Sequence, residues 1–268
     1  MKVSVILSFY NKIEWLKLVL AGYCRQSLKD FEVIIADDGS KEEVIAEISK
    51  LKSQYPFPIT HIWHPDEGWQ KNIILNKAVT ISKTHYLVFN DGDCIPHKHF
   101  VKEHYENRES NTILAGRRVN LSKDLTHKLT SSMIVKGYLE SWGLIRTLIS
   151  NEKHAENGIY FKNNLIRRFI NKKDKGVLGS NFSLPKRNLI EINGFDERYD
   201  LPAIGEDTDL EVRWRNHGMN IKSVKHLAIQ YHLFHKTLPR DNKHMAILDT
   251  HIKNKISWTN HGIIKLNR

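Results

Sequence analysis

Short apolar, β-branched runs alternate with longer amphipathic segments along the first 110 residues of the chain. Apolar runs of this length predict buried strands, and apolar positions that recur every three to four residues predict helices. The predicted strands are Val3–Leu7, Glu32–Ala36, Ile59–Trp63 and Tyr86–Asn90. The predicted helices are Glu14–Arg25, Glu42–Lys52 and Lys71–Ser82, and Ser40 with Glu43 predicts a capping box at the start of the second. This alternation predicts an α/β fold with a mostly parallel sheet and helices on both faces.

The second half of the chain has a less regular pattern. A pair of helices is predicted over Leu125–Ile149, and the polar, basic stretch Asn151–Gly176 predicts a mobile loop. Regular structure is predicted again from Gly179, with a strand at Gly179–Leu184, a helix at Lys186–Ile192 and a turn at Asn193-Gly194. A helix at Glu206–Asn216, which ends before Gly218, and a strand at Lys225–His232 follow.

Composition and charge narrow the class of protein. Among the 268 residues, 40% are hydrophobic and 26% are charged, which is a globular balance and argues against disorder. No stretch approaches the roughly 18 apolar residues of a membrane span, and no signal-peptide layout is visible. The two cysteines, Cys24 and Cys94, cannot form a disulfide framework, so we expect a reducing, cytoplasmic setting.

The net charge of +11 is unevenly distributed. Residues 1–58 hold eight basic and eight acidic side chains, whereas residues 215–268 hold ten basic and two acidic ones. A further six basic residues and one acidic residue lie in Lys162–Lys175. A basic second half suits nucleic acid, an anionic membrane or a phosphorylated ligand, and it also suits a solvated surface with no partner.

Acidic residues follow two of the predicted strands. In a parallel sheet, ligands bind beyond the carboxyl ends of the strands. Asp91-Gly92-Asp93 directly follows Tyr86–Asn90, and these carboxylates suit Mg²⁺ or Mn²⁺ bound to a diphosphate. Asp37 and Asp38 follow the second strand and could accept hydrogen bonds from a base or a ribose. The alternative for both segments is a turn with solvated or capping side chains.

The second half offers a base and further metal ligands. Glu206-Asp207-Thr208-Asp209 opens a predicted helix, where a carboxylate either caps the helix or accepts a proton from a substrate hydroxyl. His232 and His235 are three residues apart, a spacing that places them on opposite faces of a strand. We therefore expect one of the two histidines, not both, to bind an ion.

These segments together resemble a family 2 glycosyltransferase with the GT-A fold. The resemblance rests on Val5–Asn11, the Asp37–Ser40 segment and Asp91-Gly92-Asp93, which occur in the order of that family. The second half resembles the C-terminal region that galactosyltransferases share with chondroitin-type polymerases, through Gly179–Phe182, Asn193–Glu197, Gly205–Leu210 and Tyr231-His232. Relatives usually have a tryptophan before the Glu-Asp pair, and Leu201–Gly205 lacks it, which leaves the acceptor undefined.

The resemblance implies a role for each matching residue. Residues 1–118 would form a Rossmann-like nucleotide-binding half, residues 119–240 an acceptor-binding half and residues 241–268 a basic helical tail. The UDP-sugar would contact Ser8, Tyr10, Asp37, Asp38, Lys71 and Asp91. The metal, Mn²⁺ or Mg²⁺, would bind Asp93 and His232, with His235 as the alternative ligand. Asp207 would be the general base, Glu206 would bond the substrate, and Asn181 and Glu206 would contact the acceptor.

The resemblance therefore implies a metal-dependent inverting transfer of a hexose or N-acetylhexosamine from a UDP-sugar to a glycan or lipid-linked glycan. It also implies bacterial surface polysaccharide synthesis, with peripheral contact to anionic lipid at the inner face of the plasma membrane. A sugar-phosphate nucleotidyltransferase is an alternative, although Ser8–Asn11 is not the Gly-rich phosphate loop that this class needs. A nucleic-acid-binding protein is a second alternative, but no nucleic-acid-binding motif is present, so we expect no nucleic-acid partner.

Overall fold

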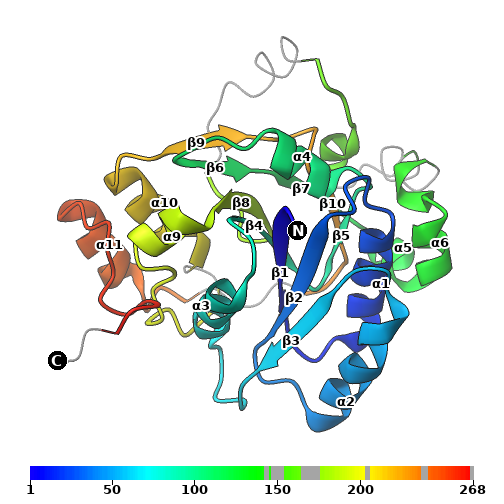
Figure 1. Cartoon of the computed structure of the whole chain (residues 1–268), viewed down its shortest axis with the longest axis horizontal. Coiled ribbons are helices and arrows are strands. Elements are labelled where there is room, and N and C mark those ends of the chain that lie inside the picture. Colours follow the sequence, from blue (N-terminus) through cyan, green and yellow to red (C-terminus); the bar gives the residue numbers. More distant parts are fainter. Residues whose placement is uncertain (142–144, 146–153, 164–175, 203–205, 237–240, 266–268) are drawn as a thin grey trace.

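The computed structural model describes all residues except 142–144, 146–153, 164–175, 203–205, 237–240 and 266–268 (Figure 1). The first half contains β1 (Val3–Phe9), α1 (Ile13–Cys24), β2 (Phe31–Asp37), α2 (Glu42–Leu51), β3 (Ile59–Trp63), α3 (Lys71–Ile81), β4 (Tyr86–Asp91), β5 (Cys94–Pro96), α4 (Phe100–Glu106), β6 (Thr112–Ala115) and β7 (Arg117–Asn120). The second half contains α5 (Lys123–Lys128), α6 (Ser131–Val135), β8 (Asn181–Pro185), α9 (Lys186–Glu191), α10 (Glu206–Asn216), β9 (Asn220–Ser223), β10 (Ile229–His232) and α11 (Met245–Lys253). The chain therefore forms the predicted α/β fold.

One sheet runs through both halves of the chain. Its strand order is β3-β2-β1-β4-β8-β6-β9, and only the β4–β8 and β8–β6 pairings are antiparallel. The prediction of a mostly parallel sheet is thus confirmed. A smaller sheet of order β5-β10-β7 lies next to it, and β10 brings residues from late in the chain beside β5.

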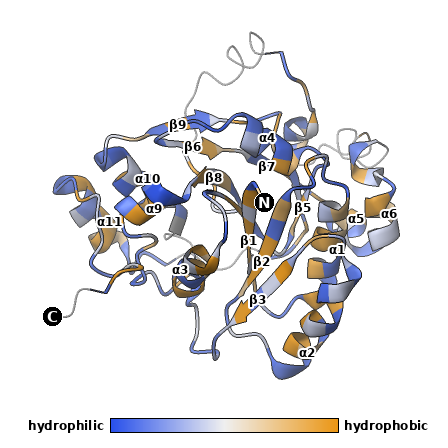
Figure 2. Cartoon of the chain, in the orientation of Figure 1, coloured by the Kyte–Doolittle hydropathy of each residue, from blue (hydrophilic) through white to orange (hydrophobic). Residues whose placement is uncertain are grey.

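Side chains that point alternately to the two faces of the sheet form two hydrophobic cores. Successive side chains of a strand point to opposite faces. Val5 and Leu7 of β1 pack on one face with residues of α1, α2 and α4, whereas Ile6 packs on the other face with residues of α3, α9 and α10. Figure 2 shows hydrophobic residues on the central strands and mixed residues on the helices around them. Both faces are covered, as the strand–helix pattern predicts.

Several local predictions differ from the structure. The predicted capping box at α2 is wrong because Lys41, not Ser40, is the N-cap, and no side chain caps this helix. Ser40 instead accepts a hydrogen bond at 2.7 Å from the backbone N–H of Asn11, which follows β1. Within Leu125–Ile149, the described part holds the two short helices α5 and α6, and most of the predicted loop Asn151–Gly176 lies outside the described residues.

The C-terminal segment packs onto the rest of the molecule. Its helix α11 contacts α10, and His251 of α11 is buried. Asn193, with φ of 64°, and Gly194, with φ of 74°, form the predicted turn, and Asn193 Nδ2 donates to the carbonyl of Thr259 at 2.7 Å. The described part of residues 241–268 is therefore not a free tail. No described helix has the length and apolar character needed to cross a membrane.

Candidate active site

A cleft of about 790 Å³ opens at the carboxyl ends of β1, β2 and β4. We call it the strand-end cleft. Its lining includes the predicted residues Ser8, Tyr10, Asp38, Lys71, Asp91, Asp93, Asp207, His232 and His235. These residues come from both halves of the chain. The topology brings them together because β5 follows β4 along the chain and β10 pairs with β5.

Ser8, Lys71 and Asp91 form one hydrogen-bonded group in the strand-end cleft. Ser8 Oγ donates to Asp91 Oδ1 at 2.5 Å, and Lys71 Nζ donates to the same oxygen at 3.1 Å. Ser8 and Asp91 are neighbours in the register of β1 and β4, which fixes their separation. The ammonium of Lys71 compensates the carboxylate charge at the end of the buried strand.

Asp38 lies on the opposite side of the β1 strand end. Its Oδ1 is 2.8 Å from His64 Nε2, and its Oδ2 accepts a hydrogen bond from the backbone N–H of Gln70 at 3.1 Å. Burial raises the pKa of the Asp38 carboxyl, and the hydrogen bonds with His64 and Gln70 only partly offset this effect. Tyr10 is half exposed, and its hydroxyl donates to Asp66 at 2.8 Å.

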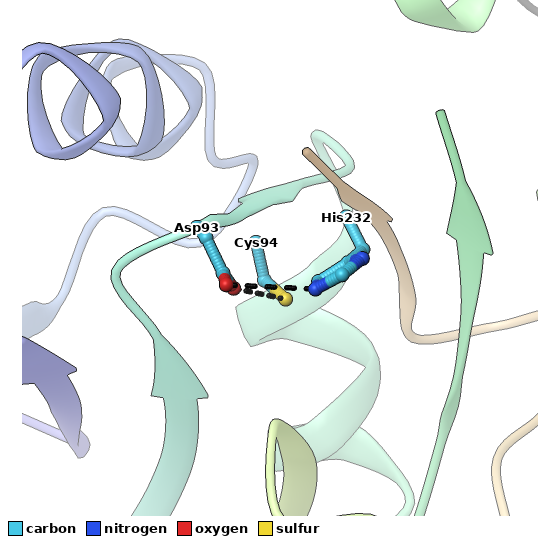
Figure 3. Close-up of side chains that lie close together, drawn as sticks. All are labelled: Asp93, Cys94 and His232. Carbon is cyan, nitrogen blue, oxygen red and sulfur yellow. Dashed lines mark hydrogen bonds and ion pairs between the residues drawn. The ribbon is translucent and has the colours of Figure 1, made fainter. Parts of the chain in front are cut away.

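Asp93 meets His232 and His235 at the end of β10, and Figure 3 shows it beside Cys94 and His232. Its Oδ2 is 3.5 Å from His232 Nε2 and 3.2 Å from His235 Nε2, and the two imidazole nitrogens are 3.1 Å apart. The backbone N–H of Leu233 donates to the Asp93 carbonyl at 2.9 Å, which holds the histidine segment against the loop after β4. β10 ends at His232, so the chain turns and both imidazoles face Asp93. The expectation that the two histidines lie on opposite faces is wrong, because it assumed a continuous strand.

The electrostatics of this group favour the ionised carboxylate. Burial opposes the charge of Asp93, but the hydrogen bonds with His232 and His235 outweigh burial and hold its pKa far below the usual range. The same contact with Asp93 raises the pKa of His235. Burial raises the pKa of the Cys94 thiol well above its ordinary value, and Cys94 Sγ donates to Asp93 Oδ1 at 3.1 Å. Asp93, Cys94 and His232 are close enough together to hold a metal ion.

Asp207 occupies the first turn of α10 and lines the strand-end cleft. The backbone N–H of Gly179 donates to its Oδ2 at 3.1 Å. This contact orients the carboxylate from the segment that leads into β8. The side chain of Glu206 is not among those that the structure describes. In the Leu201–Gly205 segment, which lacks the tryptophan usual in relatives, residues 203–205 also lie outside the described part.

Two predicted residues lie away from the strand-end cleft. Asp37 is fully buried, and its oxygens contact the backbone N–H of Ser40 at 2.9 Å and His61 Nε2 at 2.9 Å. Asn181 is fully buried in β8, where its Nδ2 donates to the carbonyls of Arg117 and Ala228. Both side chains hold backbone in place, so the structure gives no support to the predicted contacts of Asp37 with the nucleotide or of Asn181 with the acceptor.

Trp69, which the sequence predicts to lie in the core or to line a pocket, lines the strand-end cleft. Other lining residues were not predicted from the sequence, among them Phe9, Lys12, Trp15, Ile74, Arg118, Pro202 and Lys236. Trp15 lies beside His235 with 5.9 Å between ring centroids, and Lys12 lies over the Trp15 ring at 5.5 Å. Lys12 and Trp15 follow the end of β1 directly, so position alone could have identified them. Arg118 could not be identified in this way, because β7 reaches the cleft only through its pairing with β10.

A second carboxylate–histidine cluster lies beneath α10. Asp196, Asp209 and His251 have ligand atoms within 4.8 Å of one another. Arg198 donates to Asp196 at 2.6 Å, and Arg213 donates to Asp209 at 2.7 Å. The guanidinium groups already compensate both carboxylates, so this group of five residues is a buried ion network. We call it the α10 ion network.

Comparison with known proteins shows which families the chain matches. Residues 4–174 match Glycosyl transferase family 2, and residues 168–236 match the N-terminal domain of galactosyltransferase. The chain is 27% identical over 248 residues to chondroitin synthase of Escherichia coli, which covers 85% of this chain and 34% of that protein. It is 33% identical over 96 residues to cholesterol galactosyltransferase of Borreliella burgdorferi, which covers 34% of this chain and 25% of that protein. Against the first three curated relatives, the chain spans between 30% and 62% of their length.

Solved structures support the same fold. TarS residues 1–349 of S. aureus in complex with UDP-GlcNAc superposes with a TM-score of 0.58 at 16% identity, over 95% of this chain and 66% of that chain. The complex of the same protein with UDP gives a TM-score of 0.58 at 17% identity, over 95% of this chain and 65% of that chain. Sequence identity this low shows the fold alone, and the GT-A expectation agrees with it. Because the family match covers residues 4–174, the chain belongs to glycosyl transferase family 2.

Proposed function

We propose that this chain transfers a hexose or N-acetylhexosamine from a UDP-sugar to a hydroxyl group of a glycan or glycolipid. The transfer depends on a divalent metal and inverts the anomeric configuration. The observation that carries the proposal is the strand-end cleft, where Asp91 and Asp93 of one half meet Asp207 and His232 of the other. The names of the relatives, a chondroitin synthase and a galactosyltransferase, support sugar transfer, and the UDP-GlcNAc complex of TarS supports a UDP-sugar donor.

The donor set of Asp93, His232 and His235 fits a divalent metal. Two ligands about 2.1 Å from one ion lie about 3.0 Å apart at a right angle and about 3.4 Å apart at a tetrahedral angle. The three ligand atoms are 3.1, 3.2 and 3.5 Å apart. The carboxylate, with the oxygens that a donor diphosphate would supply, suits Mn²⁺ or Mg²⁺, and the imidazoles favour a transition-metal ion such as Mn²⁺ over Mg²⁺. Mn²⁺ or Mg²⁺ bound there would neutralise the charge that develops on the departing diphosphate.

Asp207 acts as the general base in this mechanism. The acceptor hydroxyl gives its proton to the Asp207 carboxylate while its oxygen forms a bond to the anomeric carbon of the donor sugar. The bond from that carbon to the UDP oxygen breaks, and UDP leaves with the electron pair. The contact with Gly179 keeps the carboxylate oriented for this step. No covalent intermediate is needed, so the product has the opposite anomeric configuration.

The nucleotide binds on the opposite side of the strand-end cleft. Asp38, held by His64 and Gln70, and the ring of Tyr10 present hydrogen-bonding and stacking groups beyond the end of β1. Lys71 approaches the diphosphate from α3, and its contact with Asp91 sets its position. These residues orient the donor so that its anomeric carbon faces Asp207.

The acceptor is a surface polysaccharide or a lipid-linked glycan of a bacterial cell, and the basic second half lies near anionic lipid at the inner face of the plasma membrane. The curated relatives named as chondroitin synthase and cholesterol galactosyltransferase support a glycan or a lipid as the acceptor class.

Product analysis tests the proposed function. The purified chain is incubated with single UDP-sugars, Mn²⁺ and a mixture of glycan acceptors, and UDP release and the anomeric signals of the product are recorded by NMR. We expect UDP release with one donor and a product of inverted configuration. A product that retains the donor configuration contradicts the displacement mechanism. In a parallel incubation with UTP and a sugar phosphate, release of pyrophosphate contradicts sugar transfer itself.

A further inference from the structure

A second cleft of about 900 Å³ lies at the opposite end of the sheet. We call it the basic cleft. It is formed by residues before β1 and β4, at the end of β8 and after α4. Thr84 and Tyr86, both almost fully buried, form part of its wall. Its volume is in the range of pockets that bind small ligands.

Charge distinguishes the basic cleft from the strand-end cleft. The strand-end cleft is lined by four Lys or Arg side chains and four Asp side chains, which balance. The basic cleft is lined by Lys2, Lys83, Arg108 and Arg187 against the single acid Glu109. Glu109 is already paired with Lys222 at 2.5 Å. The lining therefore carries an excess of positive charge, which favours an anionic ligand.

Arg108 is positioned for such a ligand. Its guanidinium lies 3.7 Å from the centroid of the Tyr105 ring, and its Nη1 donates to the Tyr105 carbonyl at 2.6 Å. These two contacts restrict the side chain before any ligand binds. The remaining N–H groups of a guanidinium match the two oxygens of a carboxylate or a phosphate. Lys2 Nζ lies 5.7 Å from the same ring, so two cations and an aromatic ring share one wall.

The basic cleft cannot hold the donor nucleotide of the strand-end cleft. Lys2 precedes β1, whereas Ser8 near the other end of β1 lines the strand-end cleft. At about 3.3 Å per residue, the strand separates these two positions by about 20 Å. A ligand in the basic cleft is therefore a different molecule or a distant part of a long one.

We propose that the basic cleft binds a segment of an acidic oligosaccharide, through carboxylate or phosphate groups on its sugars. The four cations of the lining are exposed and spread over several elements around the cleft, an arrangement that suits a flexible chain with several anionic groups. This site goes beyond the transfer reaction, because its Lys2 lies about 20 Å along β1 from Ser8 of the strand-end cleft. It would hold an acidic glycan on the enzyme independently of the donor.

Binding of defined oligosaccharides tests the proposal. Fluorescently labelled hexagalacturonate and phosphopentamannose are titrated with the whole chain, with neutral maltohexaose as the uncharged probe. The test variant is Arg108→Gln/Arg187→Gln. The matched control is Lys253→Gln/Lys255→Gln, which removes the same charge from exposed positions at the end of α11. Melting temperatures of all proteins show whether each variant folds, and Lys2→Gln/Lys83→Gln replaces the first variant if that variant does not.

We expect at least one acidic probe to bind and the cleft variant to weaken its affinity about tenfold or more, because charged hydrogen bonds are lost. The control variant should change the affinity less than twofold. An equal loss in both variants overturns the proposal, since it indicates attraction to net charge alone. Failure of both acidic probes to bind, or equal binding of maltohexaose, also overturns it. Cleft-dependent binding to phosphatidylglycerol vesicles with unchanged oligosaccharide binding would assign the site to a lipid headgroup and contradict the proposal.

Discussion

Replacing Asp209 by asparagine tests whether the α10 ion network holds the helix that carries Asp207. Asp209 and Arg213 are both almost fully buried, and Arg213 Nε donates to Asp209 Oδ2 at 2.7 Å. Asp209 Oδ1 also accepts hydrogen bonds from Tyr199 at 3.1 Å and contacts His251 Nδ1 of α11 at 2.6 Å. Asparagine has the same shape but no charge, so it leaves the Arg213 guanidinium buried without a counter-ion.

The size of this effect follows from burial. Removing one partner of a buried ion pair costs about 3–5 kcal/mol of the free energy of unfolding. Unfolding entropy of about 2.1 cal/mol/K per residue gives about 0.56 kcal/mol/K for 268 residues. The melting temperature of Asp209→Asn should therefore fall by about 5–9 °C.

Differential scanning calorimetry of the whole chain provides the assay. Asp249→Asn is the matched control, because it makes the same replacement at an exposed position of α11 and should change stability by less than about 0.5 kcal/mol. A melting temperature of Asp209→Asn within 1 °C of the unmodified chain would refute the reasoning. An equal drop in the control would show that the loss comes from net charge rather than from the buried pair.

Three further predictions address the site and the pH dependence. Asp207→Asn should lower kcat by about 10²–10⁴-fold with unchanged binding of the UDP-sugar, measured by UDP release and calorimetric titration; a normal rate would remove Asp207 as the base. Lys71→Met should raise KM for the UDP-sugar about tenfold, because it removes the cation that Asp91 positions toward the donor diphosphate. Initial rates over a series of donor concentrations measure this change. Burial raises the pKa of Asp196, but hydrogen bonds from Arg198 and Thr259 outweigh burial and lower this pKa to about 2. The ionised carboxylate therefore stabilises the fold above about pH 4, and this contribution disappears as the pH falls through 2. Asp196→Asn should therefore flatten the decrease of melting temperature between pH 4 and 2, and an unchanged slope would contradict this assignment.

The first half of the fold could be predicted from the sequence because its signals are local. The strands β1, β2 and β4 are largely apolar and buried, β3 is shorter and only partly buried, and α1 to α3 lie between them with helical periodicity. Each boundary differs from the prediction by at most two residues. Acidic residues at the ends of β2 and β4 identified the strand-end cleft for the same reason. Trp63 is an exception: it lies in β3 but is 42% exposed, because β3 is the edge strand of the sheet.

The rest depends on contacts between distant parts of the chain. The strands β5 and β7 have three and four residues, too short for a periodic signal. The strand predicted over Lys225–His232 contains β10, but its pairing with β5 and β7, which brings Arg118 and His232 to the cleft, could not be predicted. The sequence also could not separate Asp37 from Asp38, since both stand at the end of the predicted strand. In the structure Asp37 is the last residue of β2 and contacts His61, whereas Asp38 contacts His64 and lines the cleft. The packing of α11 on α10 was not predicted, because the contact of its buried His251 with Asp209 has no local signature in the sequence.

Metal-dependent donor binding tests the central claim most directly. The melting temperature of the unmodified chain is measured with a panel of UDP-sugars, with and without Mn²⁺, and compared with Asp93→Asn and with the exposed control Asp124→Asn. A ligand present at 100 times its Kd stabilises the fold by about 2.7 kcal/mol, so one UDP-sugar should raise the melting temperature by about 5 °C only when Mn²⁺ is present. The control should retain this increase and Asp93→Asn should lose it. An increase that needs no metal, or that persists in Asp93→Asn, would contradict the assignment of Asp93, His232 and His235 as the metal site.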